Sequence, residues 1–98
     1  MSNTATIDLQ KLGRDAAVHV ANVGKVELVD VVPDDDYMDR PVYRFAFLID
    51  ESVDWKSVGL VRIHLDQKLR DELIALGDAH YPVIQILSRA ELSQRTGA

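Results

Sequence analysis

The sequence predicts one α+β domain over residues 1–98. It has a mixed four-stranded sheet in the order α-β-β-β-α-β, then a short C-terminal helix, with the helices packed on the sheet. Three observations lead to this prediction. The chain has 98 residues, which is the usual length of a single domain. Apolar residues recur at helical spacing in two segments and form short β-branched runs elsewhere. Isolated glycines, prolines and aspartates separate these segments.

The first predicted element is a helix from Ile7 to Asn22. Thr6 precedes it as an N-cap, and Gly24 follows it as a stop signal. Gly13 weakens this helix by about 1 kcal/mol relative to alanine. The apolar residues that recur three and four positions apart, and so share one stripe, are Leu9, Leu12, Ala16, Val20 and Val23.

Two strands are predicted next. Residues 25–32 are rich in β-branched side chains and end at Pro33. Pro41 then opens a strand over 42–49, because proline is tolerated at the first position of a strand. Successive side chains of that strand alternate between its two faces. The core face carries Tyr43, Phe45, Phe47 and Ile49. The second face carries Val42, Arg44, Ala46 and Leu48.

Residues 58–65 are predicted as a third strand, because Val58, Val61 and Ile63 are β-branched and a helix start signal follows them. A helical interpretation that begins at Trp55 stays open, since short apolar runs are ambiguous by period alone.

Asp66 is that start signal, and it precedes a second helix over 67–76 that Gly77 ends. A last strand covers 83–87. Ser88 and Glu91 stand three residues apart, as in a capping box, and predict a short helix over 89–95. In the simplest arrangement the first three strands form an antiparallel meander. The second helix then returns the chain, so that the last strand lies parallel to the third.

Charge and composition exclude several functional classes. The formal net charge is −5, from 16 acidic and 11 basic residues. Because phosphate neutralisation by lysine and arginine dominates nucleic-acid affinity, we expect no nucleic-acid partner. The absence of cysteine excludes thiolate metal sites and cysteine nucleophiles, and the isolated glycines form no phosphate loop, so no cofactor is expected. No apolar stretch is long enough to span a bilayer and no signal peptide opens the chain, so we expect no membrane partner and a cytoplasmic location.

The second sheet face predicts an interface. It is more apolar than the solvated face of an antiparallel sheet normally is. Either the first helix covers this face, or both helices lie on the core face and the second face is buried against another chain. The second alternative leads to our functional hypothesis, an interaction or regulatory domain that binds a protein partner or forms a homodimer. The interface residues expected on this hypothesis are Val42, Arg44, Leu48, Val58, Leu60 and Trp55.

A small enzyme or ligand-binding domain is the alternative hypothesis. In the predicted meander, His80 falls at the same end of the sheet as Asp50, Asp54 and Trp55. A histidine among carboxylates beside an aromatic ring is the nearest arrangement here to an active site, with His80 and Asp54 as its catalytic candidates. No complete catalytic motif is present, so the sequence favours a non-enzymatic role without deciding it.

The acidic turn suggests a second alternative, a divalent-cation site. Asp34, Asp36 and Asp39 supply carboxylate oxygens, which are the ligands that Ca²⁺ and Mg²⁺ prefer. The turn lacks the glycine and glutamate of an EF-hand loop. An acidic turn between two strands is also commonly just solvated.

Overall fold

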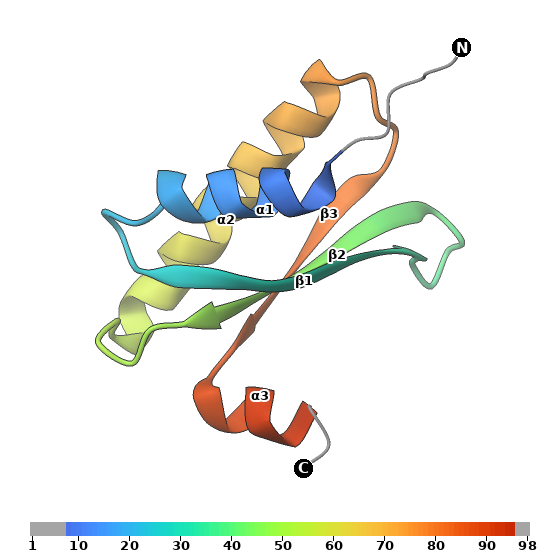
Figure 1. Cartoon of the computed structure of the whole chain (residues 1–98). Helices are drawn as coiled ribbons and strands as arrows, with labels where there is room; N and C mark the ends of the chain where they lie inside the picture. Colours follow the sequence, from blue (N-terminus) through green and yellow to red (C-terminus); the bar gives the residue numbers. More distant parts are fainter. Residues whose placement is uncertain (1–7, 96–98) are drawn as a thin grey trace.

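The computed structural model describes residues 8–95 and confirms an α+β chain, although the sheet has three strands where four were predicted (Figure 1). The elements in chain order are α1 (Leu9–His19), β1 (Val26–Asp35), β2 (Pro41–Ile49), α2 (Trp55–Ala75), β3 (Tyr81–Leu87) and α3 (Arg89–Arg95).

The strands lie in the order β1-β2-β3. β1 and β2 form an antiparallel hairpin, and β3 lies parallel to β2. A parallel pair needs a crossover connection, and α2 supplies it. The predicted three-stranded meander is therefore wrong. The predicted third strand does not exist, so the last strand lies directly beside β2 and parallel to it.

The main error of the sequence prediction concerns residues 58–65, which are helical. Asp54 caps α2 by accepting a hydrogen bond from the Ser57 N–H at 2.9 Å, so the helix begins about ten residues before the predicted Asp66 start signal. Its buried stripe repeats every four residues: Val61, Leu65, Leu69 and Leu73. Leu60 and Ile63 are exposed on the opposite side of the helix. Because they are also apolar, the four-residue period of the buried stripe was not evident in the sequence. Burial of the stripe outweighs the weak β-preference of the branched side chains.

β1 continues to Asp35, beyond the predicted end at Val32. β1 is an edge strand, so one side of its backbone has no strand partner. Pro33, which has no N–H to donate, is accommodated with its nitrogen on that side. The register between β1 and β2 shifts between Leu28 and Asp30, which indicates a β-bulge.

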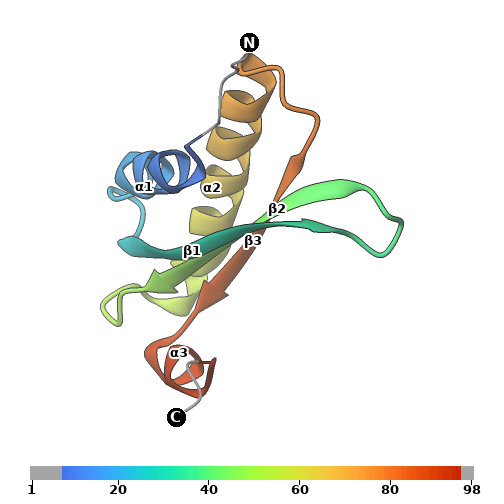
Figure 2. The same cartoon turned by 45° about the vertical axis from the view of Figure 1, so that its right-hand side comes forward.

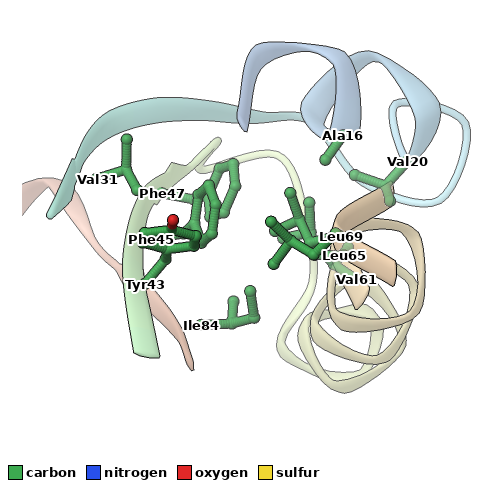
Figure 3. Packing of buried hydrophobic residues seen from close by; sticks show 11 residues of the cluster. Ala16, Val20, Val31, Tyr43, Phe45, Phe47, Val61, Leu65, Leu69 and Ile84 are labelled. Atoms are coloured by element: carbon green, nitrogen blue, oxygen red, sulfur yellow. The ribbon is translucent and has the colours of Figure 1, made fainter. Parts of the chain in front are cut away.

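The core lies between one sheet face and two helices. Tyr43, Phe45 and Phe47 of β2 point toward α1 and α2, as the alternation predicted. Figure 3 shows these rings facing the leucines of α2, with Ala16 of α1 and Val20, which follows α1, beside those leucines. Both helices therefore cover the same face, and the alternative in which the first helix covers the second face is wrong (Figures 1 and 2).

α1 is shorter than predicted, and Asp8 is its N-cap, with the Lys11 N–H donating to the carboxylate at 3.0 Å. The predicted cap Thr6 and first residue Ile7 lie outside the described residues. Gly13 lies where α1 approaches β1, and a Cβ there would stand only 2.7 Å from the Leu28 side chain. The glycine that weakens the helix therefore also permits its close packing on the sheet.

The end of α2 and the start of α3 were predicted correctly from two local sequence signals. Gly77 ends α2 with a φ of +72°, a conformation that glycine adopts without strain. Ser88 and Glu91 form the capping box of α3, with each backbone N–H donating to the other's side chain. α3 lies at the end of the sheet where β3 finishes and contacts β2 and β3 (Figure 2).

Candidate functional site

The edge of β3 is the most distinctive surface of the described chain. β3 pairs with β2 on one side only, so its other side presents backbone groups without a strand partner. The Ile84 carbonyl points outward, because it accepts a hydrogen bond from Arg62 of α2 at 2.6 Å. Backbone groups alternate between the two edges of a strand, so Pro82 and Ile86 also face outward. Pro82 fits this position because it has no N–H to donate.

A groove runs beside this edge. It has a volume of about 440 Å³ and lies between the middle of α2 and the first half of β3. The residues that line it are Arg62, Ile63, Asp66, Gln67, Pro82, Val83 and Ile84. Ile63 is the apolar side chain that α2 contributes, and 61% of its surface is exposed. An extended chain placed along β3 would therefore be able to form hydrogen bonds with the β3 backbone and to contact the Ile63 side chain of α2.

The outer face of α2 carries exposed apolar residues both inside and outside the groove. Leu60, Ile63 and Ile74 lie within roughly 60° of one another around the helix axis, on the side away from the core. All three are more than half exposed. In the first turn, Trp55 carries a largely exposed indole on a different side of the helix. Soluble helices normally carry polar residues on such a face, and these three apolar side chains lie among polar ones such as Gln67 and Asp71.

Charges flank the groove in a simple pattern. Arg62 and Asp66 lie one helical turn apart on α2, and both line the groove. Arg70 also reaches Asp66, with Nη2 3.2 Å from Oδ1. The groove thus has a positive group and a negative group on the same helix, side by side.

The predicted interface residues are only partly available. Leu60 and Trp55 are exposed on α2, and Arg44 is exposed on the second sheet face. Val58 is half-buried in the first half of α2. Val42 is fully buried and Leu48 nearly so within the chain itself, which corrects the expectation that they face a partner.

Polar groups on or near the second sheet face are paired with other residues of the same chain. Arg44 pairs with Asp34 at 2.5 Å, and this hydrogen bond holds the pKa of the Asp34 carboxyl below its usual range. Arg95 of α3 reaches Asp30 at 2.8 Å. Tyr81 stands beside Val42, and its hydroxyl donates to Asp36 in the β1–β2 turn. A partner chain is not needed to explain why Val42 is buried.

The predicted grouping of His80 with Asp50, Asp54 and Trp55 is wrong. Because β3 is parallel to β2, His80 lies at the end of the sheet where β2 begins, whereas the other three residues follow the end of β2. Asp54 is occupied as the N-cap of α2, and Asp50 accepts hydrogen bonds from the backbone and hydroxyl of Ser52.

His80 instead belongs to a cluster that sequence reasoning missed. Its Nδ1 lies 2.6 Å from Asp78, and its ring stacks on Tyr43 with 4.0 Å between ring centroids. The Tyr43 hydroxyl also donates to Asp78, at 2.7 Å. Burial, together with this hydrogen bond, raises the pKa of Tyr43 to about 12. Burial alone would raise the pKa of Asp78, but the bonds from Tyr43 and His80 outweigh it and leave that pKa below its ordinary value.

The acidic turn is organised as a hydrogen-bonded turn. Asp36 accepts from the backbone N–H groups of Met38 and Arg40, from the Arg40 guanidinium, and from Tyr81. The Tyr81 hydrogen bond is the main reason that the pKa of Asp36 lies well below its usual value. Asp39 has a positive φ of 58° within this turn. Among residues 8–95, no three His, Asp or Glu side chains are grouped so as to hold a metal ion.

Comparison of the chain with protein-family models, with curated proteins and with solved structures found no match. Within the described part of the chain, no helix combines the length and apolar character needed to cross a bilayer.

Proposed function

We propose that this domain is a protein-interaction module that takes up an additional strand at the open edge of β3. Ile63 of α2, which lines the groove beside that edge, supplies the apolar side-chain contact. The observation that carries the proposal is the edge itself, with outward backbone groups of Ile84 and Ile86 beside a groove lined by Ile63. Strand addition to an exposed edge is a recurring mode of protein recognition.

The edge is a better candidate than the second sheet face. The predicted face residues Val42 and Leu48 are buried, and Arg44 is paired. α2 carries exposed apolar residues of its own, and Ile63 among them lines the groove beside the edge. Each backbone hydrogen bond that a new strand makes contributes about 0.5–1.5 kcal/mol, and burial of apolar side chains adds to this.

The hydrogen bond from Arg62 does not close the edge. A carbonyl oxygen has two lone pairs, so Ile84 can accept from Arg62 and from an incoming strand. The outward N–H groups of Ile84 and Ile86 remain without a strand to accept from them.

Backbone amide exchange measured by NMR tests this proposal. The chain is studied at increasing concentration and also with peptides selected for binding from a displayed random library. We expect the Ile84 and Ile86 amides to become protected under at least one of these conditions. Ile63→Glu should remove the protection, because it places a charge in the groove. Equal exchange rates at both amides under every condition would overturn the proposal.

Ile74→Glu is the matched control. Ile74 is also an exposed isoleucine of α2, with 70% of its surface accessible, but it lies about three turns from Ile63 and outside the groove. It undergoes the same chemical change on the same helix. Protection at β3 should therefore persist in Ile74→Glu.

A further inference from the structure

We infer that the strand taken up at the β3 edge is a segment of another protein in which an acidic and an apolar side chain stand two positions apart. The acidic side chain binds Arg62, and the apolar side chain packs on Ile63. This inference rests on the proposed function, because it names the partner of the same edge. It follows from the contacts of Arg62, the contacts of Asp66 and the side of the sheet on which α2 lies.

Arg62 is a cation with unused hydrogen-bond donors. Its Nη1 donates to the Ile84 carbonyl at 2.6 Å, which holds the guanidinium directly beside the open edge. A guanidinium has five N–H donors, and within residues 8–95 the Nε and Nη2 groups of Arg62 have no hydrogen-bond or ion-pair partner. Arg62 is also exposed. A planar fork of donors held in this way matches a carboxylate, which accepts two parallel hydrogen bonds.

The carboxylate of Asp66 does not neutralise Arg62, because Arg70 already holds it. Nη2 of Arg70 lies 3.2 Å from Oδ1 of Asp66, and Nε lies 3.4 Å from Oδ2. Both oxygens of Asp66 are therefore paired with a cation that does not line the groove. The charge left beside the edge is the positive charge of Arg62. Its sign is opposite to the net charge of −5 of the whole chain, so this edge favours an acidic partner where the chain as a whole does not.

The spacing of the two partner side chains follows from the geometry of an extended strand. Arg62 and Ile63 both belong to α2, so they reach an added strand from the same face of the sheet. Successive side chains of a strand point to opposite faces, so the two that meet α2 are separated by one residue. A carboxylate at one of these positions suits Arg62. An aliphatic side chain at the other suits Ile63, which is 61% exposed.

The carboxylate belongs to a side chain rather than to the end of a peptide. Ile84 is the middle residue of β3, and Arg62 is held beside it. A peptide whose C-terminus ended at Arg62 would leave one half of the edge without a backbone partner. A side-chain carboxylate lets the added strand continue past Arg62 along the whole of β3.

A displayed random-peptide library sorted on the wild-type chain is the first experiment. We expect the enriched sequences to share Asp or Glu two positions from Val, Ile or Leu. The most enriched sequence is then synthesised with both ends blocked, so that its only carboxylates are side chains, and its binding is titrated by NMR. Enriched sequences without an acidic residue overturn the inference, as does binding that requires a free C-terminal carboxylate.

A double-mutant cycle tests the contact with Arg62. Arg62→Gln should weaken binding about tenfold or more, because a hydrogen bond between charged groups is stronger than one between neutral groups. Replacing the acidic residue of the peptide by its amide should weaken binding by a similar factor. The two changes together should weaken binding no further than either one alone, since both remove the same contact. Losses that simply add would contradict the contact.

Arg14→Gln is the matched control. Arg14 is an exposed arginine of α1 that does not line the groove, and its replacement changes the net charge of the chain by the same amount. Binding of the acidic peptide should therefore be unchanged in this variant. Equal losses in Arg14→Gln and Arg62→Gln would show that only the overall charge matters, which overturns the inference. Circular dichroism and thermal unfolding establish that each variant is folded.

The outcomes separate this inference from the proposed function. If peptides without an acidic residue protect the Ile84 and Ile86 amides, the acidic partner is excluded and strand addition stands. If these amides become protected at high chain concentration and with no peptide, strand addition stands but the partner is a second copy of the chain, which also overturns the inference. If neither concentration nor any peptide protects them, both conclusions fail.

Discussion

The two edges of the sheet are built differently. β1, at one edge, carries a bulge between Leu28 and Asp30, a proline at Pro33, and an ion pair between Asp30 and Arg95 of α3. α1 also packs against it. Bulges, prolines, charges and covering helices are the devices by which proteins keep other strands from an edge.

β3 has fewer of these devices. Pro82 removes one donor near its start, and Arg62 reaches one carbonyl, but the central and later backbone groups stay open beside an apolar groove. The contrast indicates that one edge is closed to association and the other is left available for it. Four predictions test this difference.

The largest effect is expected in the core that both edges share. Leu65 is fully buried on the inner stripe of α2, against the aromatic residues of β2. Leu65→Ala should lower the free energy of unfolding by about 2–5 kcal/mol, because it removes apolar contacts and leaves a cavity. Urea denaturation measures this loss. A change below about 1 kcal/mol would mean that α2 is not packed on the sheet as described.

A pair of substitutions compares the edges directly. Val32→Glu adds a charge at β1, on a side chain that is 45% exposed, and Ile63→Glu adds one beside β3. We expect Val32→Glu to leave binding of the selected peptide unchanged. Ile63→Glu should weaken it by about 1.4 kcal/mol or more, which corresponds to tenfold. Titration of the two variants with that peptide, followed by NMR, decides this, and equal weakening would show that the edges are equivalent.

Acid should loosen the contact that ties the β1–β2 turn to β3. The folded-state pKa of Asp36 is lowered, mainly by the hydrogen bond from Tyr81, so the folded state favours the carboxylate. The stabilisation is present above the ordinary value of 3.8 and is lost as the pH falls below it toward the folded-state pKa.

Tyr81→Phe is the control for this pH dependence. The variant lacks the hydroxyl, so its stability should decline less steeply in acid than that of the wild type. Urea denaturation at a series of pH values compares the two slopes. Equal slopes would show that the Tyr81 hydrogen bond does not contribute.

The smallest effect is expected at the closed edge. Arg95→Ala removes the ion pair with Asp30, whose two side chains are both partly exposed. Such pairs contribute about 0–1 kcal/mol, so the unfolding free energy should fall by no more than that. Thermal unfolding at low and high salt measures it. A loss above about 2 kcal/mol would indicate that Arg95 holds α3 in place by further contacts.

Local signals predicted several elements correctly. Ser88 and Glu91 indicated the start of α3, Gly77 indicated the end of α2, and alternation in β2 placed Tyr43, Phe45 and Phe47 on the core face. Each of these signals acts within a few residues of the chain. They can therefore be interpreted without knowing which distant segments come into contact.

The candidate site was predicted only in part. Trp55 and Leu60 were expected at an interface and are exposed, but the strand assignment put Leu60 on a sheet face. Ile63 and Arg62 were not expected, because their role depends on where α2 lies relative to β3. The cluster of Tyr43, Asp78 and His80 was missed for the same reason, since 35 residues separate Tyr43 from Asp78.

By itself, the sequence determined that this chain forms one acidic α+β arrangement with a β2 strand whose aromatic face is buried. The tertiary structure decided the rest: the helical state of residues 58–65, the parallel position of β3, and which edge stays open. The physical reason is that a short β-branched run has nearly equal local preference for helix and strand. Burial of Val61 and Leu65 against a distant sheet decides between them.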